Sequence, residues 1–204
     1  MSARKVESKE KPSIYIDTCI LRDVKDRRNQ GSIDFMSWIK IKGLTCAISI
    51  FGLMELTGIE KEDIFIRRML VYEKATLDEV ISMRKTTDLK RDEFVKCSQY
   101  IEQVADTYSF LKVVDLDNNG WNLALTIAVF SNLHATDAIH LATAWQADCA
   151  VIITRDTFFI KEATRYLKAE KLDSGDSVWS VLRICEPKEC YSVLEDMGFE
   201  HGTR

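Results

Sequence analysis

The chain contains no long uninterrupted run of apolar residues, and this absence is the first constraint on its function. Crossing a bilayer takes about 18 or more consecutive apolar residues, and none of the apolar runs in the 204 residues reaches that length. Residues 1–12 are polar and charged, and they lack the apolar core of a secretory signal peptide. We therefore predict a cytoplasmic protein without membrane contact, in which residues 1–12 form a mobile polar tail.

Zinc-type cysteine spacing and a strong positive charge are missing as well. The six cysteines are scattered through apolar segments, and Cys185 and Cys190 stand alone on either side of Pro187. A structural zinc site needs closely spaced ligand pairs, so we expect the thiols to be small buried hydrophobes in a reducing compartment. The net charge of −4 excludes a protein that coats nucleic acid through a basic surface.

What the chain does contain is enough apolar residues, 46%, for one substantial core. Short apolar runs alternate with segments of helical periodicity, which favours an α/β fold with a mostly parallel sheet covered on both faces. Strands are predicted at 13–17, 45–48, 110–116, 149–153 and 178–184. Helices are predicted at 19–28, 32–42, 50–58, 62–84, 90–109, 118–131, 136–147 and 157–170, with a last one beginning at Pro187. Residues 13–200 are expected to form one domain, with a long helical hairpin at about 62–109.

Four carboxylates occur where these strands end or helices begin. Asp17 and Asp156 close apolar runs, while Glu55 and Asp137 lie in early helical turns, the latter after the candidate N-cap Thr136. Ligands of open α/β sheets bind outside the carboxyl ends of the strands. We therefore expect the four acids to meet at one edge of the sheet.

Carboxylates gathered in this way repel one another and raise each other's pKa, so the cluster needs a counter-charge. The candidate ligands are all oxygens, which are the donors that hard cations prefer. The pattern therefore predicts a Mg²⁺ or Mn²⁺ site.

Each acid also has a simpler interpretation. Asp17, Asp137 and Asp156 can cap helices or interact with helix dipoles, each worth roughly 0.5–2 kcal/mol. Glu55 can be an ordinary exposed acid of a helix. The sequence alone leaves both interpretations open.

Other side chains near the acids are ambiguous in the same way. His140 follows Asp137 by one helical turn, so it either packs on its helix or touches substrate. The aromatic residues Phe158, Phe159 and Trp145 are expected in the core rather than as platforms for bases. Three basic groups either face phosphates or form solvated surfaces. They are Arg22, Lys25, Arg27 and Arg28; Arg155, Lys161 and Arg165; and Arg84, Lys85, Lys90 and Arg91.

The segments around the acids resemble the motifs of the PIN-domain family of metal-dependent nucleases, most closely its VapC-like toxin branch. They read IYIDTCIL, SIFGLMEL, ATDAIHLATA and IITRDTFF. All four follow the family's order and together span most of residues 13–165. Two departures are Cys19, where the family often has Asn, and the long helical stretch between Glu55 and Asp137.

The resemblance implies a three-layer α/β/α sandwich and a Mg²⁺- or Mn²⁺-dependent endoribonuclease. It assigns the acidic pocket to Asp17, Glu55, Asp137 and Asp156, and Thr154 matches the family's hydroxyl residue near the last acid. Asp17 and Asp137 are the first choices as direct metal ligands. Glu55 and Asp156 would bind through water, orient the nucleophile or complete a second metal site.

The resemblance also implies partners. Many VapC-like proteins are homodimers whose antitoxin blocks the acidic pocket, so RNA, an antitoxin and a second copy of the chain are the expected partners. An RNA-processing role without an antitoxin is an alternative, and so is a catalytically silent PIN-like module that binds RNA or protein. A phosphoacceptor domain of the receiver type is disfavoured, because its acids come in a different order.

Overall fold

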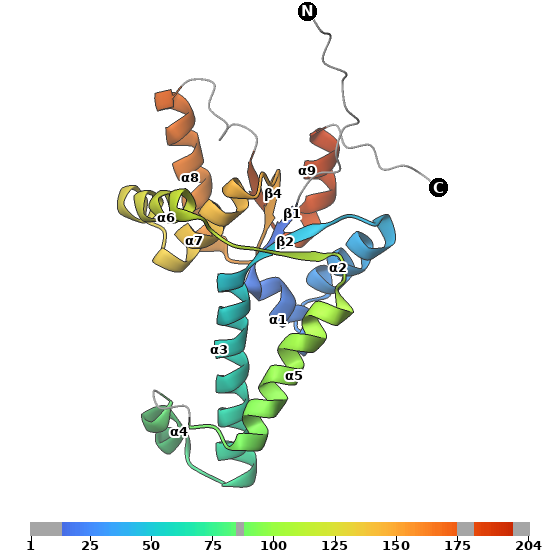
Figure 1. Cartoon of the computed structure of the whole chain (residues 1–204), viewed down its shortest axis with the longest axis vertical. Coiled ribbons are helices and arrows are strands. Elements are labelled where there is room, and N and C mark those ends of the chain that lie inside the picture. The colour runs from blue at the N-terminus through green and yellow to red at the C-terminus, as the bar shows by residue number, and fades with distance from the viewer. Residues whose placement is uncertain (1–13, 85–87, 175–181, 198–204) are drawn as a thin grey trace, which may run out of the picture.

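Five parallel strands form the centre of the molecule (Figure 1). The structure is a computed structural model and describes residues 14–84, 88–174 and 182–197. The strands are β1 (Ile14–Ile16), β2 (Cys46–Ser49), β3 (Leu111–Val114), β4 (Val151–Ile153) and β5 (Arg183–Cys185). Their order is β3-β2-β1-β4-β5, and every adjacent pair is parallel. The chain winds outward from β1 in both directions, so a crevice is expected beyond the carboxyl end of β1.

Helices fill the connections between the strands. They are α1 (Thr18–Asp26), α2 (Gln30–Lys42), α3 (Ile50–Arg67), α4 (Leu77–Met83), α5 (Arg91–Thr107), α6 (Asn118–Phe130), α7 (Ala135–Gln146), α8 (Thr157–Ser174) and α9 (Cys190–Asp196). Two short elements complete the fold, the π-helical turn η1 (Arg68–Tyr72) and the 3-10 turn η3 (Pro187–Glu189). None of the helices in the described residues is long and apolar enough to span a membrane.

Successive strand residues enter opposite layers, as the two-residue repeat of a strand requires. Tyr15 and Ile152 pack with apolar residues of α6, α7 and α8. Ile16 and Ile153 pack on the other face with apolar residues of α1, α2 and α9. The expected three-layer α/β/α sandwich with a parallel central sheet is confirmed.

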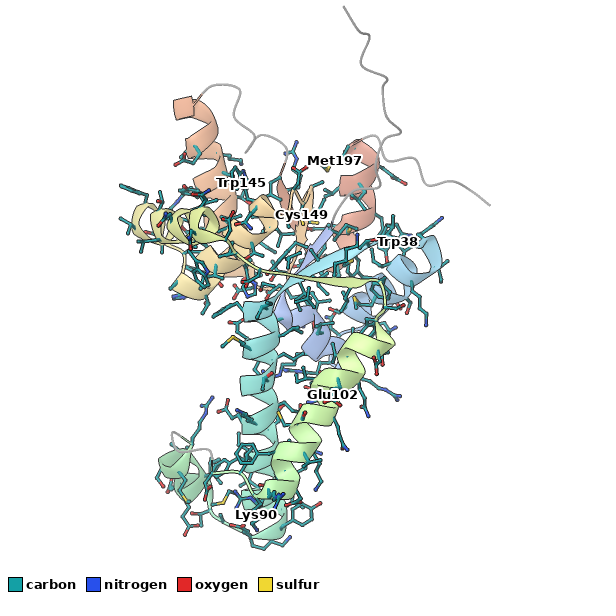
Figure 2. All side chains as sticks on the ribbon, viewed as in Figure 1. Trp38, Lys90, Glu102, Trp145, Cys149 and Met197 are labelled. Carbon is teal, nitrogen blue, oxygen red and sulfur yellow. The ribbon has the colours of Figure 1, made fainter. Side chains whose placement is uncertain are left out.

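A two-helix arm projects from this sandwich (Figure 1). Helices α3 and α5 pack side by side, and η1 and α4 lie at the far end. Figure 2 marks Glu102 along α5 and Lys90 at the far end of the arm. A separate small core of Phe65, Met69, Val80 and Leu89 holds that end together. The predicted helical insertion is therefore present as an arm.

The predicted boundaries of the first arm helix are wrong. Instead of helices at 50–58 and 62–84, α3 runs unbroken through Gly58 to Arg67, and the chain breaks later. A helical Gly costs about 1 kcal/mol relative to Ala, which packing against α5 offsets. The break comes at Lys74, whose φ of 58° is left-handed, and α4 then begins with a capping box of Thr76 and Glu79.

The remaining elements agree with the predicted ones to within a few residues. Pro187 begins η3, which leads into α9, as expected. The predicted tail 1–12, the first part of the predicted strand 178–184 and the end of the predicted domain at 200 lie outside the described residues.

Candidate metal and nuclease site

Asp17 lies at the carboxyl end of β1, in the middle of the sheet. Its backbone N–H donates to the carbonyl of Ile153 (3.0 Å), which fixes it between β1 and β4. Although Asp17 precedes α1, its side chain makes no capping hydrogen bond. Its Oδ2 instead accepts hydrogen bonds from the Thr154 hydroxyl (2.5 Å) and the Cys19 thiol (3.2 Å). The capping interpretation is therefore wrong for Asp17.

Glu55 lies in the second turn of α3 and is half-buried beside Asp17. Its Oε2 accepts a hydrogen bond from the Thr18 hydroxyl (2.9 Å) and lies 2.8 Å from His140 Nε2. Burial raises its pKa, but the hydrogen bond and charge of His140 and the bond from Thr18 outweigh it, so the pKa of Glu55 is lowered. Glu55 is therefore not an ordinary exposed acid.

His140 connects these acids to the sheet and is only 2% exposed. Its Nδ1 lies 2.6 Å from the Tyr15 hydroxyl, and its Nε2 contacts Glu55 and lies 3.9 Å from Asp17 Oδ1. Burial lowers the pKa of His140, but the bond to Glu55 and the charge of Asp17 outweigh it and raise the pKa. The ligand atoms of Asp17, Glu55 and His140 all lie within 4.8 Å of one another. His140 is not one of the four acids that the sequence predicts for the site. Its position one helical turn after Asp137 is the sequence feature that points to it.

Asp137 occupies the first turn of α7 and is half-buried. Its pKa is raised by burial and then by the charges of Asp156 and Asp17. Its Oδ2 is buried and has no hydrogen-bond partner among the described residues. The prediction that Thr136 caps this helix is wrong, because α7 begins at Ala135 and no side chain caps it.

Asp156 has both a capping role and an exposed position. Its Oδ1 accepts hydrogen bonds from the backbone N–H groups of Phe158 (2.8 Å) and Phe159 (3.0 Å), in the first turn of α8. Thr154 is buried, donates to Asp17 and accepts from the Asp156 N–H (3.0 Å). Thr154 therefore connects Asp17 by hydrogen bonds to the turn that contains Asp156.

Most side chains of the three basic groups, for which the sequence left phosphate contact and a solvated surface both open, form ion pairs. Arg22 contacts Asp63 of α3 (3.4 Å), and Lys25 contacts the neighbouring acids of that helix. Arg155 contacts the buried Asp23 (2.8 Å). Ion pairs also engage Lys161, Arg165, Arg84 and Lys90, whereas Lys85 lies outside the described residues. The charges of these described side chains are therefore at least partly balanced by acids of the protein itself.

The donor set fits a hard divalent cation. Buried carboxylate oxygens with no hydrogen-bond donor are costly unless something positive faces them, and Asp137 Oδ2 is such an atom. Carboxylate oxygens are the side-chain donors that suit Mg²⁺ and Mn²⁺. Among the described residues, the ligand atoms brought together are those of Asp17, Glu55 and His140, a group that does not include Asp137 or Asp156.

The fold and the site together define a class of protein: an α/β sandwich with an acid cluster at the carboxyl edge of its central strand. No family model and no curated protein matches the chain. Among solved structures, the chain is similar to a chain of FitAB bound to an IR36 DNA fragment. The TM-score is 0.46 and the sequence identity 12%, and the match covers 86% of this chain and 95% of that one. A likeness this distant leaves the function to be argued from the site itself.

Proposed function

We propose that the protein is a Mg²⁺- or Mn²⁺-dependent endoribonuclease of the PIN type. The observation that carries this proposal is the buried, unpartnered Oδ2 of Asp137, whose carboxyl is close enough to Asp17 and Asp156 for their charges to raise its pKa. The resemblance of the four acid-bearing segments to PIN motifs supports the same assignment. We also propose that residues 13–200 form one domain and that the protein is cytoplasmic.

The catalytic roles follow from the hydrogen bonds. When bound, the cation supplies a water of lowered pKa and offsets the charge that develops on the phosphate oxygens. Asp17 and Asp137 hold the ion. Thr154 binds Oδ2 of Asp17 and so fixes the orientation of that carboxylate.

Glu55 and Asp156 have supporting roles. Thr18 and His140 both bind Oε2 of Glu55, so Oε1 is the oxygen left to orient the attacking water. Asp156 uses Oδ1 as a cap, which leaves Oδ2 to act through water. Glu55 and Asp156 thus each use one carboxylate oxygen in hydrogen bonds within the protein, and the other oxygen is left for water.

The proposed substrate is single-stranded or exposed RNA. The net charge is −4 and basic residues such as Arg22 and Arg155 are ion-paired, so we do not expect a general electrostatic attraction to nucleic acid. RNA is therefore proposed to bind locally, at the pocket. A homodimer inhibited by an antitoxin is the proposed assembly, by resemblance to VapC-like proteins. Light scattering of the purified protein tests the dimer.

The experiment that tests the activity is cleavage of a mixed single-stranded RNA pool. Purified protein is incubated with Mg²⁺, with Mn²⁺ and with EDTA, alongside Asp17→Asn and Asp137→Asn. Asp92→Asn is the matched control, because Asp92 is an exposed acid on the arm. We expect cleavage with either metal in wild type and in the control, and at least a hundredfold loss in the two site variants. Folded wild-type protein that cleaves nothing would favour a silent binding module.

A further inference from the structure

We propose that His134 and Phe158 form a stacking platform for an unpaired base of the substrate, next to the acid cluster. This inference rests on the proposed ribonuclease function and specifies how the RNA is held. The two rings lie 5.2 Å apart between centroids, with an interplanar angle of 34°. Both side chains are exposed, and Phe158 is 41% exposed. They form an aromatic surface that is accessible to a ligand.

The platform lies between the two acids that begin α7 and α8. His134 is the N-cap residue of α7, three positions before Asp137. Phe158 is in the first turn of α8, and its backbone N–H donates to Asp156 Oδ1. The ring contact therefore joins the beginnings of α7 and α8 at the edge of the acidic pocket.

The exposure of Phe158 contradicts its expected place in the core. Phe159, the next residue, is 1% exposed and packs in the core beside α7, as expected. The first turn of α8 thus presents one phenylalanine inward and one outward. Its outward ring lies outside the core and contacts His134, so part of its face is accessible to a ligand.

An unpaired base fits this surface better than a base pair. Bases within a duplex already stack on their neighbours, whereas a single-stranded base has a free π-face that can stack on an aromatic ring. Such stacking depends little on the identity of the base. We therefore infer a preference for single strands with little sequence preference at this subsite. Because the platform reads the base and not the ribose, single-stranded DNA should also bind it.

Fluorescence anisotropy with a labelled 12-nucleotide single-stranded RNA tests the platform. The measurement uses Asp17→Asn protein in EDTA, so that cleavage does not interfere. We expect Phe158→Ala and Phe158→Leu each to weaken binding by about tenfold, because leucine keeps the apolar contact but not the π-face. Phe158→Trp should bind at least as tightly as the parent.

Phe130→Ala is the matched control. Phe130 is 75% exposed on α6, and its replacement should leave the affinity unchanged. His134→Ala should weaken binding by a smaller factor, and a thermal melt of each variant checks that it is folded. A duplex RNA should bind more weakly than the single strand and be insensitive to Phe158→Leu.

The two proposals fail in different ways. If the protein does not cleave RNA, but Phe158→Leu weakens binding and Phe158→Trp restores it, the platform stands and the nuclease proposal fails. If wild type cleaves RNA, but Phe158→Ala and Phe158→Leu bind it with parental affinity, the platform proposal is overturned. An absence of measurable RNA binding in the parent also overturns it.

Discussion

His140 is the residue through which the sheet positions the acid cluster. It bridges the buried Tyr15 hydroxyl and Glu55, and it is itself buried. A buried polar group that loses its partner costs about 1–3 kcal/mol. Removing the imidazole would take one hydrogen-bond partner from the buried Tyr15 hydroxyl and leave Glu55 held by Thr18 alone.

This bridge predicts different outcomes for two substitutions. His140→Leu should lower the free energy of unfolding by about 1–3 kcal/mol, and it should also lower the cleavage rate. His140→Gln keeps an amide that can donate to Glu55, and we expect it to retain more of the activity. Urea denaturation and single-turnover cleavage measure the two effects. Equal loss of activity in both variants, at equal stability, would contradict a positioning role.

Asp137 predicts a pH dependence whose sign follows from its raised pKa. As the pH rises through that pKa, the carboxyl ionises beside Asp17 and Asp156, so the metal-free protein loses stability. Asp137→Asn removes this charge and should therefore be more stable than wild type at pH 7. The difference should shrink on going from about pH 7 to pH 4 as the wild-type carboxyl becomes protonated. Thermal melts in EDTA across this range test the sign, and a variant less stable than wild type at pH 7 would contradict it.

The sequence located the acids but not all of their contacts. Asp17 and Thr154 are far apart in the chain, so only the pairing of β1 with β4 reveals that Thr154 binds Asp17 and that Asp17 is not a cap. The same limit applies to His140, whose two partners lie on β1 and α3. Periodicity identifies residue types and faces, whereas these contacts are tertiary.

At the scale of elements, α8 depends on Asp156 as its cap. Replacing an N-cap Asp by Ala costs about 1 kcal/mol, whereas Asn caps nearly as well. Asp156→Ala should therefore lower stability by about that amount, and Asp156→Asn should not. If Asp156 also acts on the cation, both variants lose activity. Full activity of a stable Asp156→Asn would restrict Asp156 to capping.

The far end of the arm is expected to unfold independently of the sheet. Its small core is centred on the fully buried Phe65 and is distinct from the two cores of the sandwich. Phe65→Ala should create a cavity costing about 3–5 kcal/mol. Hydrogen exchange should then increase in η1, α4 and the first turns of α5, with β1 and β4 still protected. Increased exchange in the sheet would show that the arm and the sandwich unfold together.

The arm also shows where sequence-based assignment of elements fails. Gly58 followed by charged residues favours a helix end, but a tertiary partner, α5, keeps α3 continuous. The position of the actual break could be predicted in part, because Thr76 and Glu79 have the spacing of a capping box at the start of a helix. The left-handed Lys74 gave no such signal, since lysine is not typical of that conformation.

At the scale of the whole molecule, the alternation of strands and helices was sufficient to predict the layers. Runs such as residues 14–16 and 149–153 are apolar throughout, as strands covered on both faces must be, and β1 and β4 are fully buried. The order of the strands and the direction of the arm are set by packing between distant segments. The sequence therefore predicted the class of fold, but not the order of its strands or the direction of the arm.

The central claim is that this arrangement creates a divalent-cation site, and Mn²⁺ binding followed by electron paramagnetic resonance tests it most directly. We expect saturable loss of the free Mn²⁺ signal with wild type and with Asp92→Asn, and little or none with Asp17→Asn or Asp137→Asn. Competition by Mg²⁺ should restore the signal. Binding by the two site variants equal to that of wild type, or no binding by folded wild type, would contradict the account.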